Sequence, residues 1–248
     1  MLKIRVIPTL LYKEFGLVKG TGFDSRRAVG SAVQAIKVYE MRGVDELVFL
    51  DVAATASCSG PDLDLIDDLA DECFMPLTVG GGVRSADDVG RVLHAGADKV
   101  CLGTAAITNP GVVEEASNRF GSQSISVSID FRSNGIVHTH CGARPTGRSV
   151  SEVACQMQDA GAGELLIQSV DRDGSMSGYD IAHLREVSAV TSIPVIASGG
   201  AGTYAHLLEA LSVDGVRAVA AASMFHFTEQ TPAGAKDYLR ARGVPVRR

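Results

Sequence analysis

Short runs of β-branched and aliphatic residues alternate with segments of helical periodicity along the whole chain. The runs have the length and the flanking turn residues of buried strands, and they cover residues 4–11, 46–52, 76–79, 99–102, 124–130, 164–169, 194–197 and 217–221. After each run, apolar residues recur at helical spacing, for example over residues 85–94, 149–160 and 203–211. This alternation predicts repeated strand–helix units.

Eight such units in 248 residues match the size of a (β/α)8 barrel, which typically has about 250 residues and carries its active site on the loops that follow the strands. A doubly wound open sheet is the competing fold. It would need a glycine-rich turn after its first strand, whereas the first strand here ends in LLYKEFG. We therefore predict a single (β/α)8 domain of class α/β over residues 1–248.

The two halves of the chain resemble each other. When the sequence is shifted by 119 residues, turn glycines coincide at Gly16/Gly135, Gly80/Gly199, Gly81/Gly200 and Gly96/Gly215. This repeat predicts a TIM barrel built from two fused half-barrels. It breaks at one chemically decisive position, because Asp130 at the end of the run SISVSID falls on Leu11. The chemistry at the centre of the barrel therefore does not use a symmetric pair of acids.

Composition and charge exclude several classes of protein. The chain is 46% hydrophobic and 21% charged, which is ordinary for a globular domain, and its net charge of −6 argues against nucleic-acid binding. No apolar stretch approaches the roughly 20 residues that span a bilayer, and the chain begins with a strand-like run that has no signal-peptide core. The five cysteines show no CxxC pairing and fit reduced thiols. We expect a soluble, cytoplasmic protein.

Two glycine-rich turns follow the third and seventh predicted strands, over residues 79–83 and 197–201. Glycines let the backbone approach an oxyanion, and N–H groups at a helix start favour negative charge. Each turn is matched by a hydroxyl residue after the next strand, Thr104 and Ser223. The glycines could instead only shape tight turns, but two half-symmetric turns with hydroxyl partners favour two phosphate sites. The predicted ligand is elongated and phosphorylated at both ends.

Carboxylates gather where predicted strands end, at Asp51, Asp130, Asp171 and Asp173. An aspartate in this place can act as a general acid or base, or it can stabilise the turn and cap the next helix. Asp130 ends an apolar strand, which favours the catalytic role. For Asp171 and Asp173, in the segment DRDGSMSG, the turn role is equally compatible.

Four charged residues, Arg5, Glu46, Lys99 and Glu164, lie at or just inside the starts of predicted strands. Their spacing alone indicates only charges that solvate the barrel floor, and surface pairs of this kind contribute little. The segment HTHC at residues 138–141 has alternating groups that could face a metal. It lacks a third, helix-borne ligand and maps to a short hairpin, so we expect no metal site and no cofactor.

Over essentially its full length, the chain resembles the cyclase subunit of imidazole glycerol phosphate synthase. The similar segments are GLVKG (16–20), GVDELVFLD (43–51), PLTVGGGV (76–83), GADKV (96–100), FGSQS (120–124), SID (128–130), GAGELL (161–166), DRDGSMSGYD (171–180), ASGGAG (197–202) and AASMFHF (221–227). The resemblance implies a (β/α)8 barrel that forms a heterodimer with a glutaminase docked at the barrel floor. Ammonia from the glutaminase would be condensed with a bisphosphorylated ribulosyl aminoimidazole carboxamide. The products would be imidazole glycerol phosphate and the aminoimidazole carboxamide ribotide, in histidine biosynthesis.

The resemblance also assigns roles to residues. It implies that Asp130 is catalytic, and we expect Asp51 and Asp173 to contact the substrate. The implied phosphate-site and substrate-covering residues are Gly82 and Thr104 at one end, Gly174, Gly200 and Ser223 at the other, and Lys19 on a mobile loop. The residues implied to gate an ammonia channel are Arg5, Glu46, Lys99 and Glu164, and those implied to face the partner are Asp98 and Gln123. The gate role replaces the surface-charge interpretation.

The chain also departs from the cyclase pattern. Leu11 replaces the first of two catalytic aspartates, Gly103 replaces an asparagine beside the first phosphate, and a usual GDP reads GSA at residues 30–32. The segments IPTLL (7–11) and ECFMPLT (72–78) are more similar to a paralogous branch. Members of that branch lack the first aspartate and accompany a separate amidotransferase in acetamidino-sugar formation. Losing one acid–base group typically costs about 10²–10⁴ in rate, so we expect an intact ammonia pathway and only weak cyclase activity.

Three functions from different classes stay open. The first is an ammonia-using synthase subunit, either of histidine biosynthesis or of its sugar-modifying paralogue. The second is a stand-alone phosphosugar isomerase barrel, which would need a second acid and no gate. The third is a non-catalytic barrel that only activates its glutaminase and channels ammonia. Asp130 alone is compatible with the first and the third.

Overall fold

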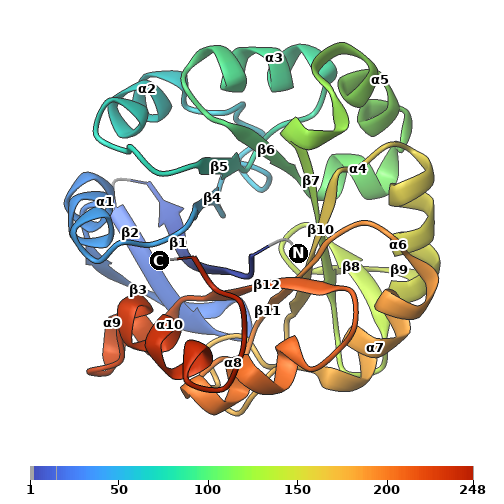
Figure 1. Ribbon diagram of the computed structural model, residues 1–248. Coiled ribbons are helices and arrows are strands. Elements are labelled where there is room, and N and C mark those ends of the chain that lie inside the picture. Colours follow the sequence, from blue (N-terminus) through green and yellow to red (C-terminus); the bar gives the residue numbers. More distant parts are fainter. Residues whose placement is uncertain (1–2, 15, 248) are drawn as a thin grey trace.

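The computed structural model describes residues 3–14 and 16–247. Among these residues, parallel strands pair in the order β1, β4, β5, β6, β7, β10, β11 and β12, and β12 pairs again with β1 to close a barrel. The strands are β1 (Arg5–Lys13), β4 (Leu47–Asp51), β5 (Leu77–Gly80), β6 (Lys99–Leu102), β7 (Ile125–Phe131), β10 (Glu164–Ser169), β11 (Val195–Ser198) and β12 (Val216–Ala221). Figure 1 shows helices surrounding this barrel. The predicted (β/α)8 fold is confirmed.

Helices follow the barrel strands and cover their outer faces. They are α1 (Ala32–Met41), α2 (Leu63–Asp71), α3 (Ala86–His94), α4 (Thr104–Thr108), α5 (Gly111–Phe120), α6 (Val150–Asp159), α7 (Ile181–Val190), α8 (Tyr204–Leu211), α9 (Ser223–Phe227) and α10 (Pro232–Arg240), with a 3₁₀ turn η1 (Ser122–Ser124). Side chains of Ser85, Ser149 and Thr203 accept hydrogen bonds from backbone N–H groups three residues on, which caps α3, α6 and α8. No helix within the described residues is long and apolar enough to span a membrane.

Two antiparallel hairpins leave the barrel at equivalent places in its two halves. The first consists of β2 (Gly16–Thr21) and β3 (Asp24–Gly30), which follow β1. The second consists of β8 (Ile136–Thr139) and β9 (Arg144–Ser149), which follow β7. The sequence predicted only the second hairpin, and a shift of 119 residues superimposes one on the other. The hairpins therefore belong to the half-barrel repeat.

Side chains that point into the barrel form layers along its axis, as the alternation of residues on a strand requires. A small apolar cluster, here called the middle layer, fills the centre of the barrel and consists of Ile7, Val48, Cys101, Leu166, Ile196, Ala218 and Ala220. Charged residues at the strand starts lie on one side of this cluster. A cavity lies on the other side, at the carboxyl ends of the strands. The apolar cluster thus separates the two functional candidates.

Candidate functional site

The carboxyl ends of the barrel strands surround a cavity of about 530 Å³. Most of the residues that the sequence assigned to substrate binding line it, namely Asp51, Gly82, Thr104, Asp130, Asp173, Gly174, Gly200 and Ser223. They come from seven different strand–helix loops and strand ends. The barrel therefore brings together residues that are far apart in the sequence, in the place where (β/α)8 enzymes carry their active sites.

Asp130 and Leu11 both line this cavity from the matching strands β7 and β1. Asp130 is half-buried, and its Oδ1 accepts a hydrogen bond from Ser128 Oγ at 2.9 Å. The Leu11 side chain is only 9% exposed and presents methyl groups at the equivalent place. The broken repeat seen in the sequence therefore becomes an asymmetric cavity, with one carboxylate where a symmetric site would have two.

The glycine-rich turns require glycine for steric reasons. Gly82 has φ of 68°, and a Cβ there would lie 2.7 Å from Ser59 O. Gly200 has φ of 105°, and a Cβ there would overlap Gly178 O. Such positive φ values favour glycine, so turn geometry alone explains the residue type. The turns nevertheless lie beside Thr104 and Ser223 at the two ends of one cavity, which suits an elongated anion.

The tips of both hairpins fold over the cavity. Gly22 N donates a hydrogen bond to Asp173 O at 2.9 Å, which joins the first tip to the loop after β10. In the second tip, His140 N donates to Thr104 Oγ1 at 2.9 Å, and Cys141 Sγ donates to Val52 O at 3.4 Å. Each tip thus contacts loops of the opposite half-barrel, so the two hairpins form a roof over the cavity.

Lys19 lies on β2, and its side chain is buried, with Nζ donating to Thr9 O at 2.8 Å. Burial lowers its pKa to about 7, and Asp173 offsets part of that effect. The sequence placed Lys19 on a loop that covers the substrate. The structure places it in the covering hairpin, but with its amine directed to β1 and not among the cavity-lining residues. Contact with a substrate stays a prediction.

The other aspartates divide between turn and cavity. The Asp51 carboxylate lines the cavity, and its Oδ1 accepts backbone N–H groups of Ala53 and Ala54 at 2.8 and 3.1 Å. Asp171 pairs with Arg132 at 2.7 Å and accepts Ser133 N. These contacts lower the pKa of Asp171 against the opposing effect of its partial burial. Asp171 therefore joins the loop after β10 to the turn between β7 and β8, and the role weighed for it within its own turn stays a prediction.

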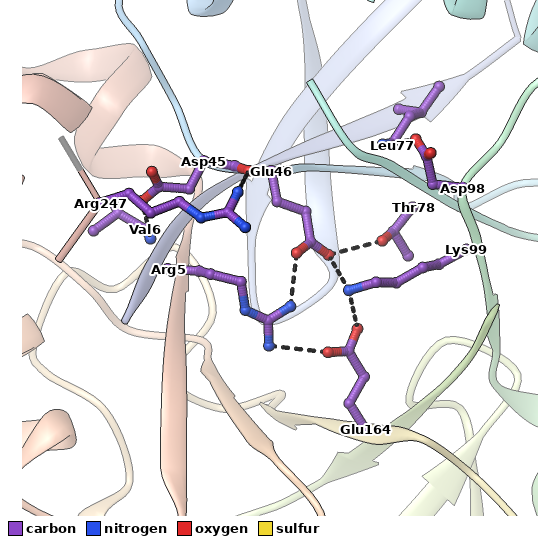
Figure 2. A network of polar contacts seen from close by, with 10 residues as sticks. All are labelled: Arg5, Val6, Asp45, Glu46, Leu77, Thr78, Asp98, Lys99, Glu164 and Arg247. Atoms are coloured by element: carbon purple, nitrogen blue, oxygen red, sulfur yellow. Dashed lines mark hydrogen bonds and ion pairs between the residues drawn. The ribbon is translucent and has the colours of Figure 1, made fainter. Parts of the chain in front are cut away.

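Four charges close a ring across the barrel floor (Figure 2). This charge ring consists of Arg5, Glu46, Lys99 and Glu164. Arg5 contacts Glu46 at 2.6 Å and Glu164 at 2.9 Å, and Lys99 contacts both carboxylates at 3.0 Å. Thr78 Oγ1 donates a further hydrogen bond to Glu46. Every carboxylate accepts from both cations, so the ring has no break.

The ring is too buried to be a set of surface charges. The glutamate side chains are 3% and 8% exposed and the cations 16% and 19%. Burial acts to raise the pKa of Glu46, but Arg5 and Lys99 outweigh it and the pKa is lowered. Burial likewise acts to lower the pKa of Arg5, but the two glutamates outweigh it, so the pKa of Arg5 is raised. The surface-charge interpretation of these residues is therefore wrong.

Small and weakly polar groups connect the ring with the cavity. Along β6, the inward-facing residues are Lys99 in the ring, Cys101 in the middle layer and Gly103 at the cavity. Two residues of a strand span roughly 7 Å, so one layer separates the charges from the cavity floor. Burial raises the pKa of Cys101 to about 12, which keeps its thiol neutral. The axis of the barrel thus lacks a fixed charge between ring and cavity, within the described residues.

Asp98 and Gln123 lie exposed beside the ring on the same floor. Asp98 precedes Lys99, and its Oδ2 accepts Leu77 N at 2.8 Å. Gln123 lies in η1, just before β7. Both residues are therefore exposed on the side of the barrel where the strands begin, and their contact with a partner stays a prediction.

The family model for histidine biosynthesis proteins matches residues 5–231, which is most of the chain. The chain belongs to this family. The family contains enzymes of the isomerase and the cyclase type, both on (β/α)8 barrels, and the match does not distinguish them.

Sequence patterns missed several residues that line the cavity. They include Phe23, Cys58 and Asn109. These residues reach the cavity through loop conformation, for which the sequence carries no periodic signal. Arg84, which directly follows the glycine-rich turn GGGV, also lines the cavity.

Proposed function

We propose that this histidine biosynthesis family member is a cyclase-type synthase subunit of a glutamine amidotransferase. Ammonia from a glutaminase would enter through the charge ring and react with a phosphorylated substrate in the cavity. The observation that supports this proposal most directly is the closed, largely buried charge ring, which lies on the same barrel axis as the cavity. An isomerase barrel has no need for such a ring, because its reaction takes no ammonia.

The chemistry assigns a separate task to each layer. Neutral ammonia can pass the ring when one ion pair opens, while the uncharged middle layer offers no trapping charge. Of the three aspartates that line the cavity, Asp130 ends an apolar barrel strand and would act as the general acid and base. Such a group typically contributes about 10²–10⁴-fold in rate. The turns at Gly82 and Gly200 would hold the phosphates of a substrate such as the ribulosyl aminoimidazole carboxamide bisphosphate. The expected products are imidazole glycerol phosphate and the aminoimidazole carboxamide ribotide.

A second candidate function is ammonia delivery without cyclase chemistry. Leu11 supports it, because a leucine at the β1 end cannot act as an acid or base. The barrel would then activate its glutaminase and pass ammonia on, for example to a sugar amidotransferase in acetamidino-sugar formation. Turnover of the ribulosyl substrate with ammonium salt, without any glutaminase, distinguishes the two functions.

The test of the proposed assembly is complex formation with a purified class-I glutaminase subunit. Asp98→Asn removes a charge at the floor and keeps an oxygen that can accept Leu77 N, so it should weaken the complex several-fold, mostly through the association rate. Asp64→Asn is the matched control, since Asp64 is an exposed aspartate in the first turn of α2, which begins at the cavity end of the barrel. Absence of a complex at micromolar concentration, with no stimulation of glutamine hydrolysis, would refute the assembly.

A further inference from the structure

The second hairpin carries a histidine and an arginine that contact each other beside the cavity. His140 lines the cavity, and its Nε2 lies 3.3 Å from Arg144 Nη1. Because a guanidinium can only donate, Nε2 accepts this hydrogen bond. The ring proton of His140 is then on Nδ1, which lies 3.0 Å from Thr139 Oγ1. The imidazole therefore holds the Arg144 guanidinium at the rim of the cavity.

The charge of Arg144 is not neutralised by a carboxylate. Arg144 is exposed and forms no ion pair with any residue that the structure describes. The other arginine near this end of the cavity, Arg84, lies beside the Asp88 carboxylate, which accepts Arg84 N at 3.0 Å. Since a guanidinium has five N–H donors and Arg144 uses one on His140, the others are available to an anion.

The same hairpin tip contacts Thr104, which the sequence assigned to a phosphate site. His140 N donates to Thr104 Oγ1 at 2.9 Å, so the hydroxyl oxygen is the acceptor. The hydroxyl hydrogen has no acceptor among the described residues and can be donated to a ligand. One histidine thus contacts the Thr104 hydroxyl through its backbone and the Arg144 guanidinium through its ring. Both donors lie around the same end of the cavity.

The backbone of this tip is held in an unfavourable conformation. His140 and Cys141 both have φ of 54°, and Gly142 follows with φ of 80°. The left-handed region is unfavourable for residues other than glycine and persists where several contacts impose it, as in ligand-binding clamps. Here Cys141 Sγ donates to a carbonyl after β4, and His138 Nδ1 lies 3.0 Å from Gly142 O. These contacts fix the position of the His140 ring.

The first hairpin has no equivalent pair. The counterparts of His140 and Arg144, 119 residues earlier, are Thr21 and Ser25. The first tip is joined to the loop after β10 through Gly22 N, by a backbone hydrogen bond. The half-barrel repeat therefore does not explain why a histidine and an arginine occur together in the second hairpin, which covers the end of the cavity beside Thr104.

We propose that Arg144 binds the phosphate group at the end of the cavity formed by Gly82 and Thr104, and that His140 positions it. The phosphate would be held by the turn and the Thr104 hydroxyl from below and by the guanidinium from the roof. Arginine suits this role because its fork of N–H donors matches phosphate oxygens in bidentate geometry. The inference rests on the proposed function, since it adds a binding residue for one phosphate of the same substrate.

Titration calorimetry with inorganic phosphate tests the role of Arg144. Arg144→Gln should weaken phosphate binding about fivefold, which allows for solvent screening at an exposed site. Arg144→Lys should have an intermediate effect, because it keeps the charge and loses the fork. Arg148→Gln is the matched control on the same strand and should leave the affinity unchanged, since Arg148 pairs with Glu152 at 2.8 Å and does not line the cavity.

Inorganic phosphate can bind at either end of the cavity, so combined variants assign the effect to one end. In Thr104→Val the hairpin tip loses the acceptor of His140 N, and Arg144→Gln should then cost less than about twofold, because residues that hold one ligand are not additive. In Ser223→Ala, at the other end, Arg144→Gln should keep its full effect of about fivefold.

Two variants of His140 test its positioning role. His140→Phe keeps a ring and removes the acceptor of Arg144, so it should weaken phosphate binding about threefold, with no further loss in Arg144→Gln. His140→Gln should restore most of the affinity, because its amide oxygen can accept from the guanidinium. A merely structural role of the imidazole would give the same loss with and without Arg144.

Three results would overturn the proposal. They are an effect of Arg144→Gln no larger than that of Arg148→Gln, an effect that is lost in Ser223→Ala and kept in Thr104→Val, and a lack of phosphate binding in the unmodified protein. The titrations contain no glutaminase. A missing glutaminase complex together with the expected affinities would therefore refute the proposed assembly and support the role of Arg144.

Discussion

The two half-barrels follow the same backbone plan: one barrel strand, a hairpin and three further barrel strands. In the first half these are β1, the hairpin β2–β3, and β4, β5 and β6. In the second half they are β7, the hairpin β8–β9, and β10, β11 and β12. The backbone plan is the same, down to the one-turn helices α4 and α9, which are related by a shift of 119 residues. The side chains at matched functional positions differ. Leu11 faces Asp130 across the cavity, and Gly103 corresponds to Ala222.

The charge ring is still less symmetric than the cavity. Three of its members, Arg5, Glu46 and Lys99, come from the first half, and only Glu164 comes from the second. The counterparts of these residues 119 positions away are Ser124, Leu165, Ala218 and Asp45. Packing constrains the backbone of both halves in the same way. A functional side chain, in contrast, is needed in only one of the two halves. This comparison leads to four predictions.

The largest effect is expected from Asp130→Asn, because no carboxylate at position 11 can replace it. Turnover of the ribulosyl substrate with ammonium salt should fall by about 10²–10⁴-fold. Leu11→Ile, at the matched position in the first half, should change turnover little. If Asp130→Asn kept the activity of the unmodified protein, the assignment of Asp130 as general acid and base would be wrong.

Glu46→Gln should destabilise the protein by about 2–3 kcal/mol in urea unfolding, somewhat less than a fully buried broken ion pair. The pKa of Glu46 is lowered in the folded state. The stabilisation of the folded protein by ionised Glu46 is therefore fully present above the ordinary glutamate pKa of 4.5. It is lost as the pH falls through the lowered pKa of the folded state.

The difference between Glu46→Gln and the unmodified protein should accordingly shrink on acidification below pH 4.5. Glu152→Gln is the control, because Glu152 pairs with Arg148 at an exposed site. An equal loss in the free energy of unfolding in both variants would mean that the buried charge ring stabilises the protein no more than an exposed ion pair does.

Leu11→Asp should make the two half-barrels more alike and increase activity. It places a carboxylate at the end of β1, where Leu11 lines the cavity, and should raise ammonia-dependent turnover about tenfold or more. The measurement is steady-state turnover of the ribulosyl substrate. If the unmodified protein already turned over at about 1–10³ per second, Leu11 would be irrelevant and ordinary histidine biosynthesis would be the better assignment.

The smallest effects are expected at the paired hydroxyls. Ser223→Ala should weaken phosphate binding by about 0.5–1.5 kcal/mol, the usual net value of one hydrogen bond. Thr104→Val should cost more, because it also removes the acceptor for His140 N and loosens the second hairpin tip. Calorimetry with inorganic phosphate measures both. Identical losses would mean that the roof contact of Thr104 does not affect the site.

The barrel could be predicted from the sequence, because strands buried on both faces appear as continuous apolar runs. Each predicted barrel strand lies within two residues of the observed one at both ends. The hairpin β2–β3 was missed, since its second strand reads DSRRAVG, with little apolar alternation. Asp130 and the two glycine turns were predicted because they follow strands directly.

The sequence by itself determined the barrel, its half-repeat and the loss of one acid at Leu11, because these depend on local hydrophobic periodicity and on residue identity. Only the tertiary structure decided that Arg5, Glu46, Lys99 and Glu164 form a closed ring, since barrel closure brings β1, β6 and β10 to one axis. It likewise decided that Lys19 is buried and that Arg84 reaches the cavity. Those outcomes depend on where loops and hairpins pack, which no spacing along the chain encodes.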